Sequence, residues 1–84
     1  MPTIITFQGI KIVMRLRRKE HDPPHVHEFY QDFSAPFAIA TGEIMSGAFP
    51  LRQKTLVKHF ILQNQEELEE MWETGQYKKL PPIK

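Results

Sequence analysis

Cysteine is absent from this 84-residue chain. Its absence excludes a disulfide framework, a thiolate metal site and a thiol nucleophile, so any bound metal would need histidine or carboxylate ligands. No apolar run approaches the roughly 18 residues of a membrane-spanning helix, and the opening MPTIITFQG lacks the charged and apolar regions of a secretory signal. We therefore expect a cytoplasmic protein for which a membrane is not a partner.

The chain also has little excess of one sign of charge, because its formal net charge is only +1. The charges are unevenly placed: residues 1–63 hold eight Lys or Arg against five Asp or Glu, whereas residues 64–84 hold three against five. Such a chain is expected to present a basic surface to an anion and an acidic surface to solvent or a partner. Its length predicts a single domain of modest stability, and association with a second copy of the chain is left open.

Alternation of apolar and polar residues predicts β-structure in the first half of the chain. In IKIVMRLR, residues 10–17, every second residue is apolar, and the residues between them include Lys11 and Arg15. This pattern indicates a half-buried strand with a basic outer face. The preceding TIITF has strand composition, and the Gln8-Gly9 pair predicts a tight turn that joins the two strands in a hairpin.

The proline pair that follows stiffens the chain and favours an extended strand from about His25. PFAIATG and EIMSG predict a second hairpin, which turns at Thr41-Gly42. Together these segments give an antiparallel sheet of four to five strands.

From Pro50 onward the spacing of apolar residues changes to three and four, which is typical of an amphipathic helix. The pattern fits one long helix or two helices, over about 51–63 and 65–74, that end at Gly75. The apolar residues that carry it are Val57, Phe60, Ile61, Leu68, Met71 and Trp72. The acidic series in the second half of this region predicts a solvated surface.

The fold class predicted from these elements is α+β, with one or two C-terminal helices packed on one face of the sheet. We expect a single domain over residues 1–84, with a β-sheet part at 1–49, a helical part at 50–75 and an extended tail at 76–84.

The segment EHDPPHVHEFY, residues 20–30, carries the residues best suited to chemistry. In a strand, His25 and His27 lie on the same face with their Cα atoms roughly 6.5 to 7 Å apart. Two such imidazoles could act as an acid/base pair, or could ligate one metal ion together with a nearby third ligand. The candidate third ligands are His21, Asp22, Glu28 and Asp32, and Asp32 is the one we would take if a metal binds. We favour no metal and no cofactor. The predicted catalytic residues are His25, His27, Asp22 and Tyr30.

Basic residues near this segment suggest a phosphate-binding surface. The predicted contacts are Lys11, Arg15, Arg17, Arg18, Lys54 and Lys58. Beside the histidines they would suit a metal-independent ribonuclease, in which one His deprotonates a 2′-hydroxyl and another protonates the leaving oxygen. Tyr30 or Phe29 could stack on a base. Two plainer interpretations stand beside this one: basic residues on a strand are often a solvated face, and the histidines would be buried if Phe29, which shares their face, belonged to the core.

Several pieces of the chain together resemble a small bacterial domain-of-unknown-function family with a Pro-Pro-His-x-His signature. These pieces are MPTI, GIKIVM, HDPPHVH, ATGEIMSGAFP and EELEEMWE, and the likeness runs over roughly residues 1–75. The resemblance implies the toxin half of a toxin–antitoxin pair and a cognate antitoxin-like protein partner.

The leading hypothesis is thus a toxin-like protein that acts on RNA or on translation through His-based acid/base chemistry. The first alternative is a non-catalytic module that binds a cognate partner through its basic strand and an exposed sheet edge. The second alternative is a His-based metal-binding protein.

Overall fold

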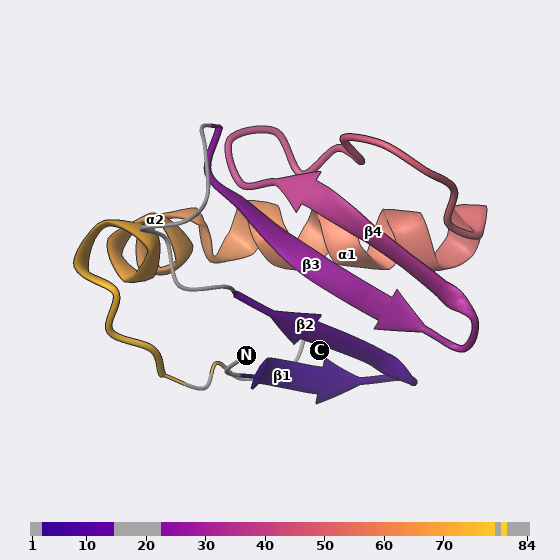
Figure 1. Cartoon of the computed structure of the whole chain (residues 1–84), viewed down its shortest axis with the longest axis horizontal. Coiled ribbons are helices and arrows are strands. Elements are labelled where there is room, and N and C mark those ends of the chain that lie inside the picture. Colours follow the sequence, from indigo (N-terminus) through magenta and orange to yellow (C-terminus); the bar gives the residue numbers. More distant parts are fainter. Residues whose placement is uncertain (1–2, 15–22, 79, 81–84) are drawn as a thin grey trace.

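A four-stranded antiparallel sheet followed by two helices forms the fold, which confirms the predicted α+β class. The computed structural model describes residues 3–14, 23–78 and 80. The strands and helices are β1 (Thr3–Phe7), β2 (Ile10–Val13), β3 (His25–Tyr30), β4 (Phe33–Ala38), α1 (Leu51–Gln63) and α2 (Gln65–Thr74). The strands lie in the order β1-β2-β3-β4, and α1 crosses behind the sheet in the view of Figure 1. Helix α1 therefore covers one face of the sheet, whereas α2 lies beyond the end of the sheet at which β3 begins.

The first hairpin turns where the sequence predicts. Gln8 and Gly9 both have positive φ angles, 50° and 79°, as a two-residue turn between twisted antiparallel strands requires. Another hairpin joins β3 and β4 through Gln31 and Asp32, and Gln31 again has a positive φ of 54°.

The segment predicted to turn at Thr41-Gly42 forms only the beginning of a fifth strand. Its ladder is a single bridge between Phe37 and Ile44, flanked by a bond of 2.8 Å in which the Met45 N–H donates to the Pro36 carbonyl. Gly42 has a φ of 73°, and a Cβ built there would lie 2.9 Å from Cγ of Lys58. The close approach to α1 therefore explains the glycine at this bend.

Two helices form rather than one long helix, with the break at Asn64. The φ and ψ of Asn64 are −126° and 27°, and its side-chain amide donates back to the Phe60 carbonyl at 2.9 Å. The side chain makes no capping bond to α2. Gln65, the first residue of α2, donates to the carbonyls of Ile39 and Ala40 at 3.0 and 2.8 Å, which fixes the start of α2 against the end of the sheet.

The core lies between the sheet and the helices, and the predicted helical positions supply one side of it. Fully or nearly buried are Val57, Phe60, Ile61, Leu68, Met71 and Trp72. Both edge strands are partly engaged, because Leu80 donates to the Ile4 carbonyl at 3.2 Å and residues 43–45 border β4. Neither described helix has the length and hydrophobicity needed to cross a membrane.

Candidate functional site

Strand β3 has two chemically different faces, set by the alternation of its side chains. Val26 and Glu28 lie opposite Phe37 and Ile12 on the neighbouring strands, and all four are fully buried on the helix side. His25, His27 and Phe29 therefore lie on the outer side. Phe29 thus does not belong to the core.

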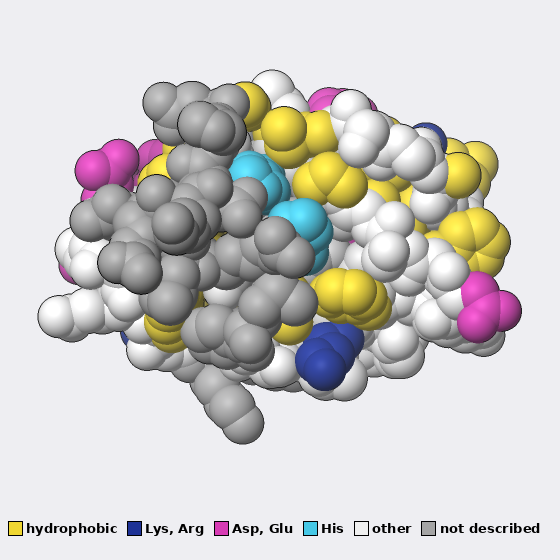
Figure 2. Space-filling model, viewed as in Figure 1, with side chains coloured by type: hydrophobic (Ala, Val, Ile, Leu, Met, Phe, Trp, Pro, Cys, Tyr) yellow, Lys and Arg dark blue, Asp and Glu magenta, His cyan; other side chains and the backbone are white. Residues whose placement is uncertain are grey.

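Phe29 is the centre of the outer face. It is partly buried in β3, an inner strand of the sheet, and its Cα partners are Lys11 on β2 and Ser34 on β4, both exposed. Directly opposed residues of antiparallel strands have Cβ atoms about 4.5 to 5.5 Å apart, so the lysine stem lies beside the aromatic ring. Figure 2 shows histidine, apolar and lysine side chains adjoining on this face.

The predicted histidine pair lies together, but its two members have different surroundings. The ring centroids of His25 and His27 are 5.2 Å apart. His25 is only 8% exposed, and its ring lies 5.2 Å from that of Trp72 on α2. His27 is partly exposed and lies between Val13 and Pro36 in the sheet. His25 thus joins the sheet to α2, whereas His27 is the more accessible imidazole.

The tautomer of neutral His25 follows from its hydrogen bond. Nδ1 lies 2.9 Å from the Pro23 carbonyl oxygen, and a carbonyl can only accept, so Nδ1 carries the proton. Nε2 is consequently the basic nitrogen of this ring. A ring held in this way has a fixed orientation, which is what acid/base chemistry requires.

The inner face of β3 holds Glu28, which the sequence suggested only as a possible third metal ligand and which lies on the opposite face of the strand from His25 and His27. Glu28 is 0% exposed, and in the described part of the chain neither carboxylate oxygen has a hydrogen-bond partner. Burial raises its pKa well above the ordinary value of 4.5, because removal from water disfavours the charged form. Its parity with Val26 is the sequence signal that could have revealed its position.

Tyr30, predicted as catalytic, shares the inner face with Glu28. Its ring packs against Phe49 with centroids 6.4 Å apart, so the sheet separates it from the histidines. Asp32, the proposed third metal ligand, lies in the β3–β4 turn, at the far end of β3 from His25. Across the described residues no group of three or more His, Cys, Asp or Glu side chains is placed to hold a metal ion. Asp22 lies outside the described residues.

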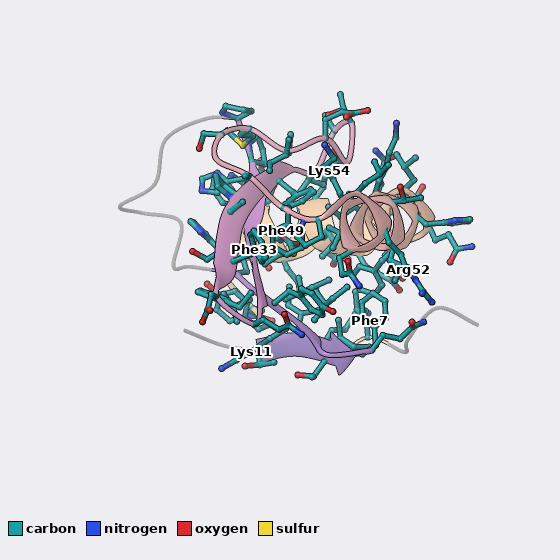
Figure 3. The ribbon with its side chains drawn as sticks, turned by 90° about the vertical axis from the view of Figure 1, so that its right-hand side faces the viewer. Phe7, Lys11, Phe33, Phe49, Arg52 and Lys54 are labelled. Carbon is teal, nitrogen blue, oxygen red and sulfur yellow. The ribbon has the colours of Figure 1, made fainter. Side chains whose placement is uncertain are left out.

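The predicted phosphate contacts do not all gather on one surface. Arg15, Arg17 and Arg18 lie outside the described residues. The structure places Lys54 and Lys58 on α1, away from Lys11, and Figure 3 shows Lys11 beside the sheet and Lys54 beside the helix. Lys58 also forms an ion pair of 2.6 Å with Glu43. The described outer face thus includes one of the predicted cations, Lys11.

Two surface hollows lie along α2, and both are lined in part by Glu67, Glu70 and Lys78. Neither includes a histidine, and the Lys78 ammonium lies 3.5 Å from a Glu67 oxygen. Their chemistry is that of a solvated acidic helix, as the acidic series predicts.

A sheet with α1 on one face and an aromatic residue beside a lysine on the other defines a small α+β domain with an open face. The family model described as DUF4160, a domain of unknown function, matches residues 9–73. The chain belongs to this family, and the matched range includes all of β2, β3, β4 and α1. No curated protein and no solved structure gives a significant match.

Proposed function

We propose that this chain is a toxin-like protein that acts on RNA, and that the outer face of its sheet binds a single strand. The observation that carries this proposal is the partly buried Phe29 ring on an inner strand, directly beside the exposed Lys11. Four-stranded antiparallel sheets with aromatic residues on the open face are a recurrent way to stack unpaired bases.

Phe29 supplies the stacking surface. The strands on either side hold its backbone, so little backbone entropy is lost when a base packs on the ring. Stacking of one base on an aromatic residue contributes about 1 to 3 kcal/mol. This interaction is tolerant of sequence, because every base has an aromatic face.

Lys11 supplies a positive charge beside the stacking surface. It is exposed and lies opposite Phe29, so its ammonium can reach the phosphate of a base stacked on the ring. A lysine at this position adds one phosphate contact and makes binding depend on salt.

The histidines give the same face a route to cleavage. His27 would accept the proton of a 2′-hydroxyl as its oxygen attacks phosphorus, and Nε2 of His25, in its protonated form, would give a proton to the 5′-oxygen as the P–O5′ bond breaks. The ring separation of 5.2 Å is compatible with action on one phosphodiester. His25 is therefore proposed as the oriented acid and His27 as the accessible base.

Resemblance supports the toxin-like part of the proposal. HDPPHVH and ATGEIMSGAFP are similar to the family with the Pro-Pro-His-x-His signature, which implies growth inhibition and an antitoxin-like protein partner. Expression of the wild-type chain should slow growth, and the double substitution His25→Ala/His27→Ala should relieve it if cleavage is the cause. Equal growth and equal RNA integrity in the two cultures would remove the catalytic step.

RNA binding is tested directly by fluorescence anisotropy with a labelled single-stranded oligonucleotide. Lys11→Ala should reduce the slope of log K against log salt by about 0.7, the value for one phosphate contact on a single strand. Lys78→Ala is the matched control, because Lys78 is also exposed but lies after α2. A wild-type chain that does not bind RNA, or a slope that Lys11→Ala leaves unchanged, would overturn this assignment.

A non-catalytic interaction module remains the second candidate, because large apolar side chains are exposed elsewhere. Phe33, Met45 and Leu51 are 39%, 41% and 74% exposed. Strand addition at a sheet edge is disfavoured, since Leu80 and residues 43–45 engage the two edge strands. Co-purification of a partner that Phe33→Ser/Leu51→Ser abolishes, together with no RNA binding, would favour this candidate.

A further inference from the structure

Glu28 is the one fully buried charged residue in the described part of the chain, and it lies in the apolar core. Its relative exposure is 0%, and neither oxygen has a hydrogen-bond partner within residues 3–14, 23–78 and 80. An unsatisfied buried polar group destabilises the native state, and an uncompensated buried charge destabilises it more. In so small a domain, Glu28 is therefore expected in the protonation state that costs less free energy to bury.

Among the described residues, those around Glu28 on its face of the sheet offer no charge to offset its own. Its Cα partners on the adjacent strands are Ile12 and Ala35, both buried. On the same face of β3, the neighbours two residues away are Val26 and Tyr30. The buried residues of α1 and α2 are Val57, Phe60, Ile61, Leu68, Met71 and Trp72, none of which is charged.

His25 is the other buried polar residue among those described, and it lies on the outer face of β3. Desolvation is the cause of the raised Glu28 pKa, with no opposing contribution from a nearby cation. The native state therefore favours the neutral carboxylic acid.

We propose that Glu28 is a proton-linked switch: the native sheet holds its carboxyl group neutral, and loss of the proton opens the sheet on the β4 side of β3. A charged Glu28 must reach water, and β4 is the edge strand next to it. Ala35, opposite Glu28, is the smallest apolar side chain in the core. The apolar layer between Glu28 and that edge of the sheet is consequently thin.

The loop after β4 closes this route in the native state. A Cβ built at Gly47 would lie 4.0 Å from Cβ of Ala35, so the loop packs against β4 at the residue opposite Glu28. The bond from the Met45 N–H to the Pro36 carbonyl, 2.8 Å long, ties the same loop to β4. Opening of this loop would hydrate the carboxylate while α1 and α2 stay in place.

The sign of the pH dependence follows from linkage. The native state binds the Glu28 proton more tightly than the unfolded state does, so stability is fully present below the unfolded pKa of about 4.5 and is lost as pH rises towards the native value. In that interval the unfolding equilibrium constant gains up to a factor of about ten per pH unit from this one group.

Regulation of the outer face would follow, because β3 also carries His27 and Phe29. Acidic conditions would hold the strand closed, and alkaline conditions would disorder the surface on its reverse side. This consequence rests on the proposed RNA-binding function, whereas the switch itself does not. The switch is therefore tested without RNA.

The experiment is urea unfolding of the full chain from pH 5.5 to 8.5, followed by the fluorescence of Trp72, the single tryptophan. Wild type is compared with Glu28→Gln, which keeps the shape, and Glu28→Met, which keeps the length without polar atoms. The ratio of the wild-type to the variant unfolding constant should rise with pH by up to about tenfold per unit. Taking this ratio cancels the contribution of the four histidines.

A ratio that stays constant across this range for both variants would overturn the switch. Hydrogen exchange at pH 6 and 8 locates the opening: the Met45 amide should lose protection in wild type relative to Glu28→Gln before the amides of α1 do. Equal loss in β4 and α1 would overturn the local opening. If one variant does not fold, the other and the wild-type slope still decide the question.

Discussion

The two faces of β3 differ more in environment than in composition. The outer face carries two histidines and a phenylalanine beside Lys11, and the inner face carries a glutamate and a tyrosine beside Val26. Each face has polar and aromatic residues, yet the outer face carries the proposed RNA-binding site and the inner face belongs to the core. Polarity alone therefore does not mark a site in HVHEFY; the face of the strand decides whether a polar residue meets a ligand or an apolar wall.

Replacing one residue on each face of the sheet by Asp should give two variants with the largest expected difference in unfolding free energy. Ile12 is fully buried opposite Glu28, and Lys11 is exposed opposite Phe29. Ile12→Asp places a second carboxyl group in the core and should cost about 4 kcal/mol or more of unfolding free energy. Lys11→Asp should change it by less than about 0.5 kcal/mol. Thermal or urea unfolding measures both, and equal losses would contradict the assignment of faces.

Removing the inner-face carboxyl should have the next largest effect. Glu28→Met should raise the free energy of unfolding at pH 8 by about 1 to 3 kcal/mol, since it removes an unsatisfied buried group. The gain should shrink towards acidic pH, because a raised native pKa makes the wild type most stable below the unfolded value. A gain that grows towards acidic pH would have the wrong sign for this mechanism.

Adjacent aromatic residues should separate binding from stability. Phe29→Ala should weaken RNA binding by about 1 to 3 kcal/mol through lost stacking, with a smaller loss of stability. Tyr30→Ala should instead destabilise the fold by about 1 to 3 kcal/mol, because it removes the packing against Phe49. Anisotropy titration and urea unfolding of both variants form the comparison. Unchanged affinity in Phe29→Ala would argue against the outer face as the RNA site.

The smallest effect is expected at Glu43, an exposed carboxylate with the opposite pH sign. Its hydrogen bond and ion pair with Lys58 lower its pKa from 4.5. The contribution to stability is present above the unfolded pKa and is lost as pH falls through the folded one. Glu43→Gln should therefore flatten the stability curve only on the acid side, while Glu28→Gln flattens it above about pH 4.5. Unfolding curves from pH 2.5 to 8.5 distinguish the two.

Local rules predicted much of the fold. The turn at Gln8-Gly9 needs only a two-residue turn with positive φ. The spacing of apolar residues predicted the helical region but left one long helix and two helices open, and the structure breaks the region at Asn64. The fifth strand was harder to predict, because its length depends on how closely the Gly42 bend approaches Lys58 on α1.

The site was less predictable, because strand alternation gives two faces without saying which one meets the helices. That choice decides the burial of Glu28 and the exposure of Phe29. The contact between His25 and Trp72 joins residues far apart in the sequence, which periodicity cannot reveal. The histidine pair itself was predictable, since two residues separated by one position always share a face of a strand.

The strand order β1-β2-β3-β4 also has a kinetic consequence. Every strand pairs with its neighbour in the sequence. Two of the three pairings, β1–β2 and β3–β4, are closed by two-residue turns and so cost little chain entropy. The β3–β4 hairpin has six paired positions and a two-residue turn, which makes it a good nucleus for folding. We expect the highest φ-values in this hairpin, so that Phe29 and Glu28 are directed to opposite faces in an early step, and packing of the helices then buries Glu28.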